Sequence, residues 1–106
     1  MADFDIGIEL VMYSEGGYWK GFSDTFKDPG GETYQGIARN FHPKWEGWTF
    51  IDEQKKIAPI KWQTKFAQLD GKVRSFYKEF FWDLLNLSEV KDQAVANSAM
   101  DMAVNL

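Results

Sequence analysis

Glycines and one proline crowd residues 16–36, and this segment limits what the chain can fold into. Glycine and proline both interrupt helices, and D-P-G-G at residues 28–31 is a strong signal for a tight turn. Aromatic and β-branched residues stand on either side of that turn, at residues 18–22 and 33–37. We therefore expect two short strands flanking the turn rather than a helix.

The segment before the glycines has the spacing of a helix. Its apolar residues recur at intervals of one, three and four: Phe4, Ile8, Val11 and Met12. This pattern predicts a first helix over residues 4–14. Asp3 or Asp5 is expected to cap the start of this helix, and Gly16–Gly17 is expected to stop it.

Most of the remaining chain is expected to be helical. A wide apolar face predicts a helix over residues 70–85, and Ser88 is expected to cap a last helix that continues to Val104. Residues 51–69 are ambiguous because Pro59 interrupts their pattern. The predicted fold class is α+β, mainly α, with a small β-hairpin after the first helix.

The composition narrows the classes of function. The 106 residues suffice for one small domain, and a net charge of −4 argues against nucleic acid as a partner. Without cysteine, and with His42 as the only histidine, neither a metal centre nor another cofactor is expected. No apolar run reaches the length of a membrane span, and the N-terminal MADFDIG lacks the features of a signal peptide. We expect a chain made in the cytoplasm that does not insert into membranes.

Glu15 is the first candidate for catalysis. It follows Ile8 and Val11 at intervals of four and three, so it lies on the buried face of the first helix. Partial burial and the negative end of the helix dipole would both raise the pKa of its carboxyl group. A carboxylic acid that stays protonated near neutral pH can act as a general acid. The alternative is an exposed glutamate that merely precedes a glycine cap.

Asp28 and Thr33 flank the glycine turn and are expected to face Glu15. An inverting glycosidase needs an acid on one side of the bond, and on the other side a base or groups that hold a water. Asp28 with Thr33 could supply that second side, although Asp28 could equally be a structural residue of an Asx-turn. Asp24 remains an alternative second carboxylate. A Ca²⁺ site made of Asp24, Asp28 and Glu32 is conceivable, but the ligand spacing of an EF-hand is missing.

Further candidates lie on the last predicted helix and in the aromatic residues. Asn97, Asp101 and Asn105 recur every four residues, which could line a cleft that binds sugar hydroxyls or form a solvated face. Tyr34 is the aromatic residue that we expect near a substrate cleft. Most other aromatic residues in so small a protein are expected in its core.

The ordered set of motifs resembles one family. E-G-G-Y (15–18), D-P-G-G-E-T-Y-Q-G-I-A (28–38), F-H-P-K-W-E-G-W (41–48) and V-A-N-S-A-M-D-M-A-V-N (95–105) resemble the glycoside hydrolase family 108 muramidases. These are phage-type lysozymes with a lysozyme-like fold, some of which carry an older secretion-activator label. The resemblance implies that Glu15 is the catalytic acid and that Asp28 and Thr33 belong to the site. It also places Asp101 and Asn105 in a shared motif.

Family members continue past the V-N motif, whereas this chain ends one residue after Asn105. The resemblance thus implies an N-terminal catalytic domain over residues 1–106, truncated at its C-terminal end, which a further region or a partner chain would complete.

The expected activity is cleavage of the β-1,4 bond in peptidoglycan glycan strands at the bacterial cell wall, by general-acid catalysis with inversion. Two alternatives stay open. One is a non-catalytic glycan-binding or secretion-related module on the same scaffold. The other is a lytic transglycosylase, which uses one acid and no activated water.

Overall fold

The computed structural model describes residues 1–104, which form two compact units. The terminal unit combines Met1–Ser14 with the chain from Arg74 onward, and the central unit is Glu15–Val73. Among the described residues, none of the helices could span a membrane, given their length and hydropathy.

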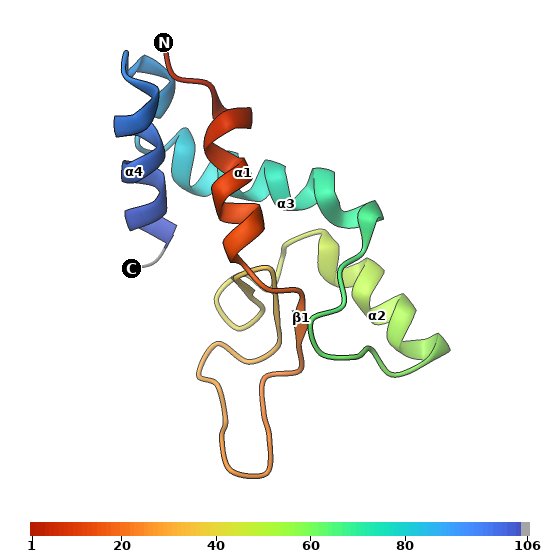
Figure 1. The fold of residues 1–106 in the computed structure, drawn as a ribbon. Coiled ribbons are helices and arrows are strands. Elements are labelled where there is room, and N and C mark those ends of the chain that lie inside the picture. Colours follow the sequence, from red (N-terminus) through yellow and green to blue (C-terminus); the bar gives the residue numbers. More distant parts are fainter. Residues whose placement is uncertain (105–106) are drawn as a thin grey trace. The chain divides into compact units, whose positions relative to one another are not determined.

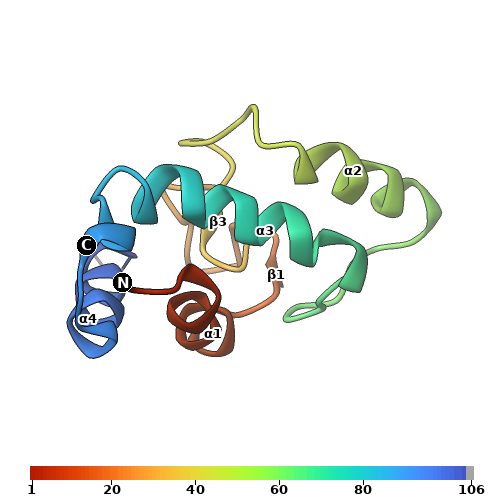
Figure 2. The ribbon, with the colours of Figure 1, turned by 90° about the horizontal axis from the view of Figure 1, so that it is seen from above.

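The terminal unit is built on two helices that lie side by side, α1 (Phe4–Ser14, red) and α4 (Gln93–Val104, blue), as Figures 1 and 2 show. The predicted first helix is confirmed. Gly7 on α1 packs closely against Trp82 and against Asn97 of α4. A Cβ at this position would lie 2.6 Å from the Trp82 ring and 3.3 Å from the Asn97 side-chain oxygen. The buried apolar side chains of this unit are Ala2, Phe4, Ile8, Val11, Phe76, Tyr77, Trp82, Leu87, Ala96 and Met100.

The caps of these helices were predicted only in part. Asp3 does cap α1, since its Oδ1 accepts a hydrogen bond of 2.9 Å from the Asp5 backbone N–H. The expectation that Ser88 caps the last helix is wrong. Asp92 takes that role, because its Oδ1 accepts from the Ala94 N–H at 2.9 Å. Ser88 lies in the 3₁₀ turn η3 (Leu87–Glu89), and its hydroxyl oxygen accepts a hydrogen bond of 2.7 Å from Trp82 Nε1.

The predicted helix over residues 70–85 is shorter than expected. Helix α3 (Asp70–Tyr77) passes into a π-helical turn, η2 (Lys78–Trp82), where the Asp83 N–H bonds to the Lys78 carbonyl at 2.8 Å. Such a turn holds one extra residue, which shifts the side chains that follow it around the helix axis. Trp82 is fully buried at its end.

The central unit contains a three-stranded antiparallel sheet, β1 (Tyr18–Trp19), β2 (Thr33–Tyr34) and β3 (Ile37–Ala38), in that order. The two strands predicted at residues 18–22 and 33–37 do pair, over residues 18–19 and 33–34. Ile37, however, lies on a third strand, because Gln35 and Gly36 both take positive φ angles, of 46° and 82°, and form the tight turn. Residues between β1 and β2 form a long loop (Figure 1), and D-P-G-G is a turn within it.

The sheet is accompanied by α2 (Gly47–Ile57) and the 3₁₀ turn η1 (Ala67–Leu69). Helix α2 ends at Ile57, and the backbone of Ala58 is extended. The ring of the following Pro59 disfavours a helical conformation at Ala58. The buried apolar side chains of this unit are Tyr18, Tyr34, Ile37, Trp48, Ile51, Leu69 and Val73. The predicted fold class, mainly α with a small antiparallel sheet, is confirmed.

Candidate functional site

Glu15 is partly buried and directly follows α1. The turn after it is fixed to the segment at residues 63–64. The Gly17 N–H donates to Gln63 Oε1 at 2.7 Å, and the Tyr18 N–H donates to the Thr64 carbonyl at 2.9 Å. The Gln63 N–H returns a bond of 2.9 Å to the Tyr18 carbonyl. The backbone that carries Glu15 is therefore anchored within two to three residues of its carboxylate.

The glycines of E-G-G-Y serve this anchoring. A Cβ on Gly17 would overlap the carbonyl oxygens of both Gln63 and Thr64. Gly17 is not among the residues with a left-handed backbone, so close approach rather than a special φ angle requires glycine there. Helix α1 ends before these glycines as predicted, and the segment they contact explains why both are small.

Thr33 is tied to the same turn through the sheet. It lies on β2, partly buried, opposite Trp19 on β1 and Ala38 on β3. Beyond the paired residues, the Gln35 N–H donates to the Gly17 carbonyl at 3.3 Å. The two motifs that the sequence paired, E-G-G-Y and D-P-G-G-E-T, thus share one small sheet.

Asp28 forms the Asx-turn that was the structural alternative for it. Its Oδ1 accepts from the Gly30 N–H at 2.8 Å, and its carbonyl accepts from the Gly31 N–H at 2.9 Å. Its own N–H donates to the Gly21 carbonyl at 2.8 Å. Asp28 is partly buried, so one carboxylate oxygen shapes the turn while the side chain keeps some contact with solvent.

The conceivable Ca²⁺ site is not formed. Within the described part of the chain no three His, Cys, Asp or Glu side chains gather as a metal site would require. Asp24 is exposed on the loop, and Glu32 points to cationic partners instead.

A network around Glu32 is the main feature that the sequence did not reveal. Both carboxylate oxygens of Glu32 are used: Oε1 accepts from Arg39 Nη1 at 2.8 Å, and Oε2 accepts from Lys55 Nζ at 2.8 Å and from the Tyr18 hydroxyl at 2.5 Å. Arg39 also binds Asp52 through two parallel hydrogen bonds of 2.7 Å each. The network therefore joins β1, the end of the long loop, the turn after β3, and α2.

These contacts set the protonation of the network. Burial alone would raise the pKa of Glu32, but hydrogen bonds from Lys55, Tyr18 and Arg39 outweigh it and hold that pKa below its usual value. Arg39 lowers the pKa of Asp52 to about 2. Burial and the hydrogen bond to Glu32 raise the pKa of the Tyr18 phenol. Glu32 is thus a carboxylate held in its charged form, which suits a structural role better than proton transfer.

Tyr34, which was expected to stack on substrate, has no exposed surface. Its ring stacks on Trp45 and Phe66, with centroids 6.1 and 6.2 Å away. Its hydroxyl oxygen accepts a hydrogen bond of 2.7 Å from the Phe66 N–H. In this conformation Tyr34 offers no ring face to a sugar and belongs to the core of the central unit.

The polar strip of the last helix belongs to the terminal unit. Asp101 is exposed on α4, and the Asn97 side-chain oxygen accepts a hydrogen bond of 2.7 Å from Gln93 Nε2. Asn105 lies outside the described residues. The role expected for these residues in substrate binding stays a prediction.

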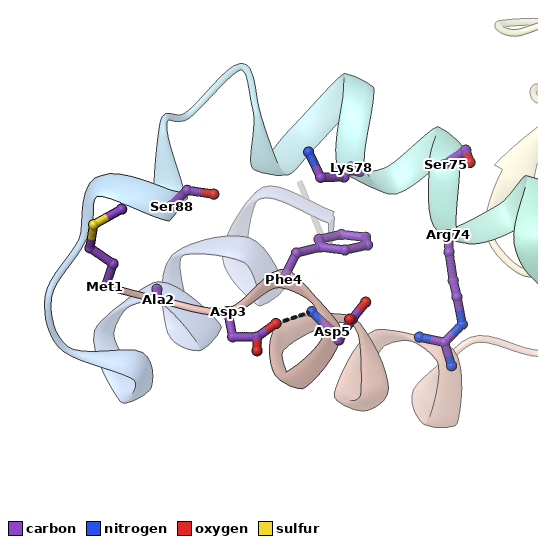
Figure 3. A pocket seen from close by; sticks show the side chains of 9 residues that line it. All are labelled: Met1, Ala2, Asp3, Phe4, Asp5, Arg74, Ser75, Lys78 and Ser88. Atoms are coloured by element: carbon purple, nitrogen blue, oxygen red, sulfur yellow. Dashed lines mark hydrogen bonds between the residues drawn. The ribbon is translucent and has the colours of Figure 1, made fainter.

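Among the described residues, each of the two units contains a hollow at its surface. The first, of about 520 Å³, lies beside the start of α1 and is drawn in Figure 3. Its two cationic side chains are paired with acidic residues outside the lining: Arg74 with Glu9 at 2.7 Å, and Lys78 with Asp83 at 3.0 Å.

The second hollow has a volume of about 620 Å³ and lies on the long loop between β1 and β2. It is lined by aromatic, charged and amide side chains together with Asp28. Of the two hollows it alone includes a predicted catalytic residue.

The comparisons with known proteins agree with the motifs. The family described as Glycosyl hydrolase 108 matches residues 8–106, which is nearly the whole chain. No curated protein and no solved structure matches the chain. The matched range contains both E-G-G-Y and D-P-G-G-E-T, the motifs that carried the resemblance. The chain therefore belongs to the glycosyl hydrolase 108 family and represents a glycoside hydrolase of the general lysozyme type.

Proposed function

We propose that this chain carries the catalytic residues of an N-acetylmuramidase, which hydrolyses the β-1,4 bond next to N-acetylmuramic acid in peptidoglycan. The single observation that carries the proposal is the placement of Glu15. It is a partly buried glutamate directly after α1, on a turn anchored to Gln63 and Thr64. The proposed substrate places its action at the bacterial cell wall, with glycan strands as its partner.

Glu15 protonates the leaving glycosidic oxygen in this mechanism. A general acid must be held within hydrogen-bond reach of the atom it protonates, and the anchored turn supports such positioning. Asp28 and Thr33 hold and activate the attacking water. Asp28 uses Oδ1 for the Gly30 N–H, which leaves Oδ2 for the water. Inversion follows if water attacks from the face opposite Glu15.

Substitution of Glu15 by glutamine tests the acid. Glu15→Gln keeps size and polarity but removes the proton donor, so release of reducing sugar from purified peptidoglycan should fall by about 10²- to 10⁴-fold. The matched control is Glu79→Gln, because Glu79 is an exposed glutamate on η2. Activity that survives in Glu15→Gln at the level of the control contradicts the proposal. A wild-type protein that binds glycan without cutting it is instead the non-catalytic module.

One observation favours a second reaction, lytic transglycosylation. That reaction needs one acid and no activated water, and the turn of residues 28–31 already uses one oxygen of Asp28. The products differ in mass, since a transglycosylase leaves an intramolecular anhydro-sugar where a hydrolase adds water. Mass spectrometry of the fragments released by the wild-type protein separates the two reactions.

A further inference from the structure

We propose that the hollow on the long loop between β1 and β2 is a subsite for an N-acetylated sugar of the glycan strand. This inference rests on the proposed function, because it extends the substrate beyond the bond that Glu15 cleaves. The hollow lies within the central unit and is formed by the loop from Lys20 to Asp28 together with Gly31 and Asn40.

The loop that forms the hollow is held in shape by its own backbone. The Ser23 N–H donates to the Phe26 carbonyl at 2.7 Å, and Phe22 and Lys27 form an isolated antiparallel bridge. The Asp28 N–H closes the loop by donating to the Gly21 carbonyl at 2.8 Å. A preformed loop loses little conformational freedom on binding, which favours affinity.

Two aromatic rings of this loop remain open to solvent. Phe22 and Phe26 are each 56% exposed and both line the hollow. Lys20 Nζ lies 4.8 Å from the centroid of the Phe22 ring, so an ammonium group already contacts that ring. Phe26 is therefore the ring that we assign to stacking against the apolar face of a sugar.

Polar groups around the rings match the rest of a sugar. Asn40 Nδ2 donates to the Pro29 carbonyl at 3.1 Å, which orients the amide at the edge of the hollow. Asp24 and Lys27 add an acceptor and a donor to the same lining. A volume of about 620 Å³ is that of a ligand pocket, which spans roughly 300–1,000 Å³. Hydroxyl and acetamido groups require such mixed donors and acceptors beside an apolar surface.

The hollow reaches one of the proposed catalytic residues, since Asp28 is part of its lining. Gly31 also lines it, with a φ of 71°, and a Cβ at this glycine would lie 2.7 Å from the Asn40 amide nitrogen. Glycine at position 31 therefore lets the Asn40 side chain pack closely against this part of the lining. A sugar bound there would belong to the same strand whose bond is cleaved.

Binding of a β-1,4-linked N-acetylglucosamine tetramer tests the subsite, with the Glu15→Gln protein as background so that the probe is not cut. Phe26→Ala should raise the dissociation constant of the tetramer about tenfold, which corresponds to a loss of about 1.4 kcal/mol of binding free energy. The matched control is Phe41→Ala, because Phe41 is 67% exposed but does not line the hollow. Circular dichroism verifies that both variants keep their helices.

Two-dimensional NMR of the same titration locates the bound sugar. The amides of residues 21–28 should shift on addition of the tetramer. Equal affinities of the Phe26→Ala and Phe41→Ala variants, or unshifted loop amides, would overturn the subsite. Its failure is separable from failure of the proposed function. A wild-type protein that releases no reducing sugar but loses tetramer binding in Phe26→Ala keeps the subsite and loses the hydrolase.

Discussion

Gly17 shows how one missing carbon positions the candidate acid. A Cβ there would overlap the carbonyl oxygens of Gln63 and Thr64, which are backbone atoms and cannot move aside cheaply. Gly17→Ala should therefore lower the free energy of unfolding by about 1–3 kcal/mol. Gly71→Ala is the matched control, because Gly71 lies in α3 with nothing within 4 Å of the added carbon.

Chemical denaturation checks this pair of variants. Gly71→Ala should raise the free energy of unfolding by about 0.5–1 kcal/mol, since alanine favours a helix. If Gly17→Ala proves as stable as the wild-type protein, the close contact at residues 63–64 is not present in solution.

Asp28 combines two roles that one substitution can separate. Asparagine keeps an oxygen for the Gly30 N–H, so Asp28→Asn should change the free energy of unfolding by less than about 1 kcal/mol. It removes the charge that would activate a water, so hydrolysis should fall by about 10²-fold or more. Measured rates and melting curves of one preparation give both values. Unchanged activity would favour the transglycosylase, for which the carboxylate is dispensable.

The sequence predicted individual residues best where local chemistry decides. The cap and the end of α1 depend on nearby residues: Asp3, one of the two predicted capping residues, caps the helix, and the helix ends at Ser14 as predicted. Tyr34 was predicted near a cleft because tyrosine suits sugars, yet two distant aromatic rings, Trp45 and Phe66, bury it. The spacing of residues in the sequence does not predict contacts between such distant positions.

At the scale of elements, the Glu32 network joins the strands to α2. Glu32 is only 12% exposed in its side chain and receives bonds from Tyr18, Arg39 and Lys55. Glu32→Gln weakens these charge-assisted bonds and should lower the free energy of unfolding at pH 7 by about 2 kcal/mol. Urea denaturation measures this loss.

The same network predicts how stability depends on pH. The folded-state pKa values of Glu32 and Asp52 lie below their ordinary values of 4.5 and 3.8. Their contribution is therefore complete above about pH 5 and is lost as the pH falls toward 2. The raised pKa of Tyr18 acts at the other end, since its contribution is complete below its ordinary value of 10.0 and is lost above it.

Melting temperatures between pH 2 and 7 test the predicted loss of stability at acid pH. The wild-type protein should lose stability steeply in that range, whereas Glu32→Gln should give a flatter curve. Glu53→Gln is the matched control, because Glu53 is an exposed glutamate on α2, the helix that carries Asp52 and Lys55, and its ion pair with Lys56 at 3.3 Å lies at the surface. A wild-type curve as flat as that of Glu32→Gln would contradict the network.

Elements were predicted well in kind and less well in extent. Helical spacing identified α1, and the two strands predicted at residues 18–22 and 33–37 pair over the shorter ranges 18–19 and 33–34. The helix predicted over residues 70–85 gives way at Lys78 to a π-helical turn, which its apolar pattern does not disclose. An apolar face remains continuous in sequence even where the backbone hydrogen bonds change partner, so periodicity alone cannot place such a turn.

At the scale of the whole molecule, the chain forms two compact units whose boundaries the sequence does not show. The central unit is one continuous stretch, whereas the terminal unit joins both ends of the described chain, because α1 packs on α4. No linker or change in composition marks residues 14–15 or 73–74. The division depends on which buried side chains meet, and only the three-dimensional structure supplies those contacts.

Two compact units need not open together, and a reciprocal pair of core variants tests whether they do. Ile8 on α1 and Ile51 on α2 are both fully buried, one in each unit. Ile→Ala at such a site costs about 2–5 kcal/mol. If each unit is a separate cooperative element, Ile8→Ala should speed amide hydrogen exchange mainly in residues 4–14 and 93–104. Ile51→Ala should instead act mainly within residues 15–73. Exchange that rises evenly along the chain in both variants would show that the units unfold as one, and the anchored turn at Glu15 would then share the stability of the α1–α4 pair.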